Sequence, residues 1–140
     1  MNVIQFLIPK SATAYLTDSS SVRTGLEKMK FHGYRAIPVI TARGKYAGTV
    51  TEGDFLRCVM EHGSDLHDLE RIRIKEIINA DFNPAQRIDV PLRDLFGRVT
   101  EQNFVPVVDD RGSFIGIVTR RKVMRHLCET CFADESELIK

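Results

Sequence analysis

The sequence has no tryptophan, only three cysteines and almost no net charge. Its formal charge is +1 at pH 7, from 20 Lys and Arg against 19 Asp and Glu, so no global field draws the chain to nucleic acid or to an anionic membrane. Apolar runs such as Ile37–Ile40 are far shorter than the roughly 20 residues of a membrane-spanning helix. Because the amino terminus also lacks the pattern of a signal peptide, we expect a cytoplasmic protein with no membrane partner.

The three cysteines do not indicate a disulfide framework, because their number is odd and 43% of the chain is hydrophobic. Cys128 and Cys131 form a C-x-x-C spacing, but no second ligand pair accompanies them to complete a zinc site. A redox dithiol normally opens a helix, whereas this pair closes a predicted one. Free thiols are therefore favoured over metal or redox chemistry, and no cofactor is expected.

The chain contains an internal repeat. Residues 36–51 align with residues 104–119 at an offset of 68, and seven of the sixteen positions are identical. Each copy has two apolar runs around a polar turn at Gly44 or Gly112, which is typical of adjacent strands. Residues at helical spacing precede and follow each pair, so each half is predicted as strand, helix, strand, strand, helix.

One such half has about 60 residues and buries too little surface to be stable alone, so the two halves are expected to pack together in an α/β (α+β) fold. We expect a first unit at residues 1–71 and a second unit, with a C-terminal tail, at residues 72–140. The polar stretch Glu61–Arg71 is predicted to be a short linker at the end of the first unit.

This repeat resembles a tandem pair of CBS motifs, also called a Bateman module. The family pattern is a strand ending in Pro-Val, a glycine-centred turn, and then G-h-h-T/S-x-x-D/N at the start of a helix, where h is apolar. Gly48–Asp54 matches the last part, whereas Gly116–Lys122 departs from it at Lys122. The resemblance implies two motifs with pseudo-two-fold symmetry, ligand clefts between them, adenine nucleotides as ligands, and no catalysis.

Within the family, Thr119-Arg120-Arg121 and the run Gly33–Val39 are similar to small stand-alone bacterial proteins that bind cyclic-di-AMP. Those proteins carry a lysine on the first strand where this chain has Ala12, with Lys10 two residues away. The resemblance also implies that the halves cross to form two unlike clefts. The cationic cleft would contain Ala12, Ala14, Tyr34, Arg35, Ala36, Thr119, Arg120 and Arg121. The other cleft would contain Thr51, Asp54, Phe82, Asn103 and Phe104.

The chemistry of the cationic cleft depends on Arg120, Arg121 and Lys122, which occupy the first turn of a predicted helix. The helix dipole disfavours each positive charge there by about 0.3–1 kcal/mol, and a phosphate held by guanidinium groups and helix N–H groups would compensate. Alternatively, these side chains extend into water or pair with acids such as Glu101 or Asp109. Tyr34 would either stack on a base or pack in the core.

Thr51 and Asp54 also allow two interpretations. A threonine followed three residues later by an acid is typical of a capping box that satisfies the first N–H groups of a helix. The same carboxylate could accept both hydroxyls of a ribose. The second cleft would then be empty, structural or specific for a nucleoside.

The leading hypothesis is therefore a regulatory module that binds cyclic-di-AMP, AMP or ATP and signals to an unidentified partner protein, with a homodimer implied by the family. The alternative is a ligand-free structural or interaction domain that mediates dimerisation or protein contacts. Nucleic-acid binding is not expected, because the basic segment Arg120–His126 must also pack apolar residues inward. An enzyme is not expected either, since no nucleophile, metal-protease or Walker-type motif is present.

Overall fold

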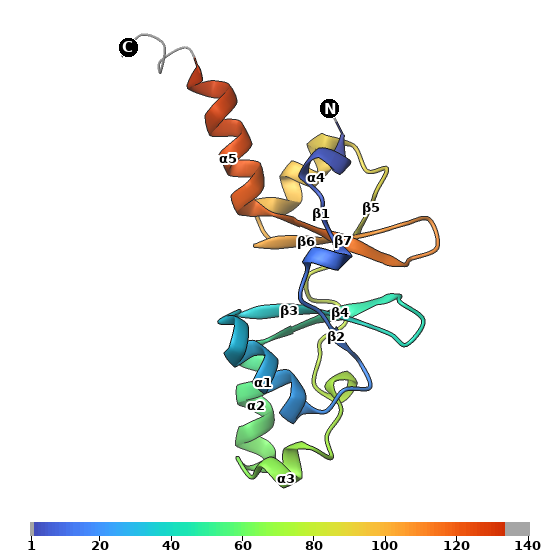
Figure 1. Cartoon of the computed structure of the whole chain (residues 1–140), viewed down its shortest axis with the longest axis vertical. Coiled ribbons are helices and arrows are strands. Elements are labelled where there is room, and N and C mark those ends of the chain that lie inside the picture. Colours follow the sequence, from blue (N-terminus) through green and yellow to red (C-terminus); the bar gives the residue numbers. More distant parts are fainter. Residues whose placement is uncertain (1, 134–140) are drawn as a thin grey trace.

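Two units of the same topology lie end to end in the computed structural model, which describes residues 2–133 (Figure 1). The first unit consists of β2 (Leu16–Thr17), α1 (Val22–His32), β3 (Ala36–Ile40), β4 (Tyr46–Thr51) and α2 (Glu52–His62). The second consists of β5 (Gln86–Arg87), α4 (Leu92–Val99), β6 (Phe104–Val108), β7 (Phe114–Thr119) and α5 (Arg120–Cys131). The strand, helix, strand, strand, helix order predicted for each half is confirmed.

Shorter elements precede and connect the two units. The chain begins with η1 (Val3–Phe6), β1 (Ile8–Pro9) and η2 (Lys10–Ala12). The connection between the units contains α3 (Leu66–Leu69) and η3 (Ile74–Glu76). The prediction of a plain linker at Glu61–Arg71 is wrong, because Asp65 caps α3 and Leu69 is buried in the core.

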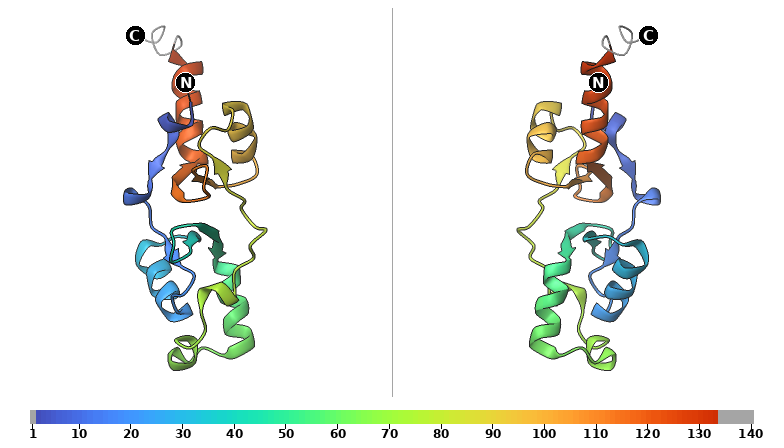
Figure 2. Two further views of the ribbon diagram at one scale, coloured as in Figure 1. Left: turned by 90° about the vertical axis from the view of Figure 1, so that its right-hand side faces the viewer. Right: turned by 90° about the vertical axis from the view of Figure 1, so that its left-hand side faces the viewer.

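The sheets of the two units face each other, with the larger helices on their outer sides (Figures 1 and 2). One sheet has the order β2-β3-β4, and the other has the order β1-β7-β6-β5. In both sheets the repeated hairpin is antiparallel, and its turns meet across the interface. Phe114 donates its N–H to the Gly44 carbonyl at 2.8 Å, and Tyr46 donates to Gly112 at 3.2 Å.

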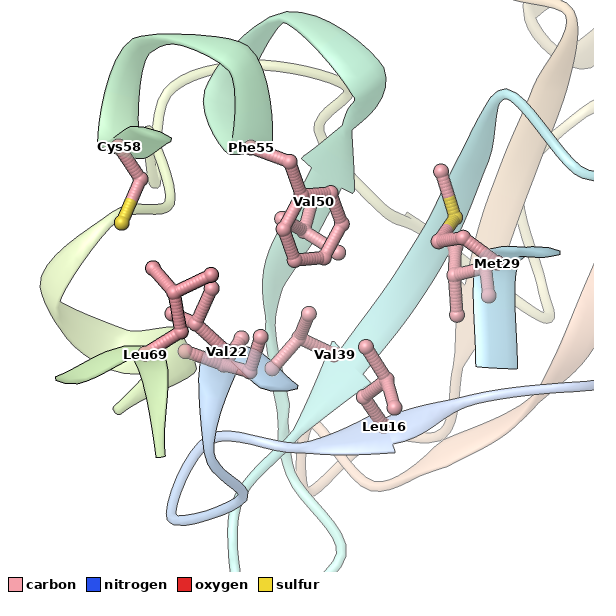
Figure 3. Close-up of a cluster of buried hydrophobic side chains, with 10 residues drawn as sticks. Leu16, Val22, Met29, Val39, Val50, Phe55, Cys58 and Leu69 are labelled. Atoms are coloured by element: carbon pink, nitrogen blue, oxygen red, sulfur yellow. The ribbon is translucent and has the colours of Figure 1, made fainter. Parts of the chain in front are cut away.

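Each unit has its own hydrophobic core, and each core takes residues from both sides of the expected boundary at residue 71. Ile74 is fully buried in the first core together with Val22, Val39 and Phe55. Figure 3 shows Leu69 of α3 beside Val22 in the same cluster. The second core contains residues of the amino-terminal segment in addition to those of its own unit: Val3, Phe6, Leu95, Val99, Val105, Val107, Val118 and Val123.

The structure shows the state of the cysteines and the character of the helices. All three cysteines are free thiols: Cys58 is buried in the first core, whereas Cys128 and Cys131 are exposed on α5. Burial raises the pKa of the Cys58 thiol. None of the helices between residues 2 and 133 is long and apolar enough to cross a membrane. Residues 134–140 of the expected C-terminal tail lie outside the described residues.

Candidate functional site

A cleft of about 270 Å³ lies between the two units. Both repeats and the amino-terminal segment contribute to it, and its lining residues are Ile8, Ala12, Thr13, Ala14, Tyr34, Ala36, Pro38, Asn103, Phe104, Ile117 and Thr119. The structure thus brings together Ala12, Ala14, Tyr34, Ala36 and Thr119, which were predicted to share a cleft. Ligand binding by these residues stays a prediction at this point.

The cleft is open because small side chains form one of its walls. Ala12 and Ala14 come from the amino-terminal segment, and Ala36 begins β3. The other walls are mostly apolar, with Ile8 paired to Ile117 across β1 and β7. A few polar groups, those of Thr13, Asn103 and Thr119, interrupt these walls. An apolar slot with few polar groups is the usual form of a site for a flat, small ligand.

Tyr34 stands at the edge of this cleft, at the end of α1. Gly33 ends the helix in the left-handed conformation, with a φ of 68°, and turns the chain into β3. The Tyr34 ring stacks on the His32 ring with a centroid distance of 5.1 Å and an interplanar angle of 5°. Tyr34 is 45% exposed, so it lines the cleft and is not a core aromatic residue.

Arg120 does not line the cleft, which corrects the prediction. Its guanidinium donates to the Val99 carbonyl at 2.7 Å and to the Thr100 carbonyl at 3.5 Å, at the end of α4. A third hydrogen bond reaches Asn103 Oδ1 at 2.9 Å. The cation therefore compensates the carbonyl groups that a helix leaves unsatisfied at its C-terminus, where a positive charge is favourable. Neither a phosphate nor an acidic residue is needed to explain its position.

Arg120 also orients Asn103 toward the cleft. Because arginine only donates hydrogen bonds, the Asn103 oxygen must face Arg120, and the amide nitrogen is left to donate elsewhere. Asn103 is exposed and lines the cleft, so this nitrogen is available to a ligand. Arg120 thus fixes the orientation of the Asn103 side-chain amide.

We expect Arg120→Ala to destabilise the protein, because it removes charge-assisted hydrogen bonds at the end of α4. The expected loss in the free energy of unfolding is about 1.5–3 kcal/mol, measured by urea denaturation. Arg121→Ala is the matched control: Arg121 is exposed and should change stability by less than about 0.5 kcal/mol. Equal effects of the two substitutions would contradict the role assigned to Arg120.

Arg121 and Arg35 also lie outside the cleft lining. Arg121 lines a separate groove along α5, which adjoins the cleft at Ile8 and Thr119. Arg35 is exposed, and its backbone carbonyl accepts a hydrogen bond from Glu52 N–H at 3.0 Å. The cleft itself is therefore less cationic than predicted, and the positive charge lies at its edge.

Asn103 and Phe104 belong to the first cleft and not, as predicted, to the second. Phe104 pairs with Thr119 in the β6–β7 register, and this pairing places both residues beside Ala36. Phe82 is 48% exposed on the connection between the units and is not part of the first cleft. Ile8, Thr13, Pro38 and Ile117 also line the cleft but were not predicted, since pairing between the two-residue strand β1 and β7 leaves no recognisable sequence pattern.

Thr51 and Asp54 form the predicted capping box at the start of α2. Asp54 N–H donates to Thr51 Oγ1 at 3.2 Å, and Thr51 N–H donates to Asp54 Oδ2 at 2.9 Å. The Thr51 hydroxyl also donates to Oδ2, and Arg57 lies 3.4 Å from Oδ1. The carboxylate is 6% exposed and already accepts several hydrogen bonds, so the geometry favours capping, and the ribose role stays a prediction.

At the position related to the first cleft by the repeat, polar side chains form a hydrogen-bonded network. Asn83 is 6% exposed with a φ of 58°, and its Nδ2 donates to Thr49 Oγ1 at 3.1 Å. Gln102 Nε2 donates to Asn83 Oδ1 at 2.7 Å, and Tyr46 OH donates to the Asn83 carbonyl at 2.7 Å. Tyr46 and Thr49 hydroxyls lie 2.7 Å apart. Buried polar groups are thus paired within the protein.

The repeat explains why this network forms at one of the two positions and not at the other. Tyr46 and Thr49 correspond to Phe114 and Ile117, which have no hydroxyl groups. Gln102 corresponds to Tyr34, whose ring lies against His32. The network therefore cannot form in the first cleft, and its walls stay apart.

Burial raises the pKa of Tyr46 to about 12. The folded state binds this proton more tightly than the unfolded state, so the contribution of Tyr46 to stability is present below the ordinary tyrosine pKa of about 10 and is lost as pH rises toward 12. We expect the absorbance of tyrosinate to rise in a separate step near pH 12, and Tyr46→Phe should remove this step. A titration at 295 nm that is unchanged by the substitution would contradict the assignment.

The comparison with protein families decides the classification. The CBS domain model matches residues 8–61 and 87–129, which is more than half of the chain. The chain belongs to the CBS domain family. The two matched segments coincide with the two CBS motifs of the fold and contain residues that line the open cleft.

Individual proteins are also similar to this chain in sequence. Cyclic di-AMP receptor B of Bacillus subtilis is 27% identical over 124 residues, which cover 88% of this chain and 84% of the receptor. Homoserine O-acetyltransferase of Methanocorpusculum labreanum is 28% identical over 122 residues, but these make up only 24% of that enzyme. The similarity to the enzyme therefore concerns a small part of it.

Two solved structures show the same CBS fold. The crystal structure of CbpB in complex with c-di-AMP has a TM-score of 0.86 and 23% identity, covering 96% of this chain and 91% of that chain. The crystal structure of CBSX2 in complex with AMP has a TM-score of 0.73 and 23% identity, covering 92% of this chain and 97% of that chain.

Proposed function

We propose that this CBS protein is a cytoplasmic regulatory module that binds an adenine nucleotide, foremost cyclic-di-AMP, in the open cleft between its two motifs. The observation that carries the proposal is the difference between the two repeat-related positions: one is an apolar slot of about 270 Å³, whereas at the other Asn83 is hydrogen-bonded to Thr49 and Gln102. The similarity to cyclic di-AMP receptor B supports the choice of ligand.

The cleft offers groups suited to the parts of a nucleotide. Ala12, Ala14 and Ala36 leave room for a flat base against Ile117, and the Asn103 amide can donate to a ring nitrogen. Thr119 lies at the N-terminus of α5, where the helix dipole favours a phosphate. Arg121 lies in the adjoining groove, within reach of a phosphate that extends out of the cleft. We assign no catalytic residue.

The proposal is tested by a thermal-shift panel of cyclic-di-AMP, AMP, ADP, ATP and S-adenosylmethionine, followed by calorimetry. A ligand at 100 times its dissociation constant should stabilise the protein by about 2.7 kcal/mol. We expect the largest shift with cyclic-di-AMP and a single site per chain, because the polar side chains at the repeat-related position already hydrogen-bond one another. With no tryptophan and three tyrosines, a copurified nucleotide would also raise the ratio of absorbance at 260 nm to that at 280 nm.

If no ligand of the panel shifts the melting temperature and the denatured protein releases no nucleotide, the nucleotide proposal fails and a ligand-free interaction domain is favoured. The exposed apolar side chains of Phe31, Leu56, Met60 and Met124 on the outer helices would suit such contacts. We also propose that they support a homodimer, which light scattering coupled to size exclusion tests directly.

A further inference from the structure

A second and larger concave surface runs along α5, beside the nucleotide cleft. This groove has a volume of about 650 Å³ and is lined by Gln5, Phe6, Ile8, Thr119, Arg121, Lys122, Arg125, His126 and Glu129. We call it the α5 groove. Its lining residues on α5 run from Arg121 to Glu129, or about two turns, so the groove extends beyond the first turn of the helix on which the phosphate hypothesis was based.

Among residues 2–133, the cations of the α5 groove have no acidic partner in an ion pair. No ion pair in the described part of the chain involves Arg121, Lys122 or Arg125. No side-chain hydrogen bond within residues 2–133 holds them either, in contrast to Arg120, which is bound to the end of α4. Arg121 and Lys122 lie in the first turn of α5. The positive end of the helix dipole disfavours both cations there, in addition to the repulsion between their two charges.

The basic residues of the α5 groove lie along one face of the helix. Arg121 and Arg125 are four residues apart, as are Lys122 and His126, so the side chains of each pair lie on the same side of α5. Apolar groups from the amino-terminal segment form the other side of the groove. His126 contacts the Phe6 ring edge-to-face at 5.1 Å, and Ile8 lies at the end next to the cleft.

We propose that the α5 groove binds an acidic segment of a partner protein, with carboxylates against Lys122 and Arg125 and an apolar side chain against Ile8. Charge complementarity is the basis of the proposal, because the groove presents several cations that form no ion pair with residues 2–133, and its lining contains a single acid, Glu129. The proposal extends the proposed regulatory function, since a sensor needs a surface through which it engages its target.

The groove favours a polypeptide over other anions for two reasons. A single inorganic phosphate would occupy only a small part of the groove and would make no favourable contact with its apolar side. A nucleic-acid strand carries a phosphate at every step, and one of these would meet Glu129 at the far end of the groove. A protein segment can place acids opposite Lys122 and Arg125 and a neutral or basic residue opposite Glu129.

The test uses the full chain and a fluorescein-labelled peptide that carries glutamates at helical spacing with a leucine on each turn. Binding is measured by fluorescence anisotropy without nucleotide. We expect the double substitution Lys122→Ala and Arg125→Ala to weaken binding by about tenfold or more, and Glu129→Gln to strengthen it. The matched control, Arg93→Ala with Arg98→Ala, removes two exposed cations from α4 in the same unit and should change the affinity by less than about twofold.

Equal losses in the two double variants would show only nonspecific charge attraction and would overturn the proposal. Oligothymidylate of similar length that binds more tightly than the peptide through Lys122 and Arg125 would overturn it in favour of nucleic acid. The absence of any peptide binding would also overturn it. Nucleotide binding is measured separately by calorimetry on the parent protein, so a failed nucleotide titration with intact peptide binding would reject only the function proposed above.

Discussion

Ala12→Trp should abolish nucleotide binding, because the indole would fill much of the open cleft. Ala12 is an exposed residue of η2 that lines the cleft, so its side chain can grow without entering either core. We expect the dissociation constant for cyclic-di-AMP to rise at least about 100-fold, which corresponds to roughly 2.7 kcal/mol, when measured by isothermal titration calorimetry.

The control for this substitution is Ala42→Trp, which adds the same ring at an exposed position in the β3–β4 turn. Ala42 does not line the cleft, so this variant should bind nucleotide like the parent protein. Circular dichroism should show both variants folded. Unchanged binding by a folded Ala12→Trp protein would place the nucleotide elsewhere.

Gly116→Ala should cause the largest loss of stability that a single methyl group can produce in this chain. A Cβ at Gly116 would lie 2.2 Å from the Ile8 carbonyl oxygen and 3.0 Å from Leu7 Cδ1, and the residue has a φ of +155°. Either β1 must leave β7 or the backbone must change its conformation. We expect a loss of about 3 kcal/mol in the free energy of unfolding, or roughly 10 °C in the melting temperature.

The comparison variant is Gly97→Ala. Gly97 lies within α4, and a Cβ there would meet nothing within 4 Å. Alanine should therefore stabilise the helix by about 0.5–1 kcal/mol. If both glycine variants shift the denaturation midpoint in the same direction, close contact between β1 and β7 does not determine the effect at Gly116.

The repeated hairpins and their helices could be predicted from the sequence because their signals are local. Alternating apolar runs, the turns at Gly44 and Gly112, and the threonines before α2 and α5 are each contained within a few neighbouring residues. The prediction that Ala12, Ala14 and Ala36 share a cleft rested on the family resemblance. The structure places all three residues in one cleft.

The partners of Arg120 and Asn83 could not be predicted in the same way. Arg120 binds main-chain carbonyls at the end of α4, and every residue has a carbonyl, so no side-chain pattern reveals which one is used. Asn83 bonds Thr49, which is 34 residues away, and Gln102 on the other side in the sequence. These contacts form only when the connection between the units, which carries Asn83, has brought Thr49 of the first unit and Gln102 of the second unit together.

That crossing makes the two repeats inseparable as folding units. Val3 and Phe6 complete the core of the unit that the chain forms last, and Leu69 and Ile74 complete the core of the unit that it forms first. A polypeptide cut between the repeats would leave each half with an incomplete core and with apolar residues that belong in the other. During synthesis, Val3 and Phe6 can be buried in this core only after β6, β7 and α5 have left the ribosome. The repeat in the sequence is thus not the unit that folds: the first core uses a continuous stretch from Leu16 to Ile78, whereas the second core joins Val3 and Phe6 to residues 88–123.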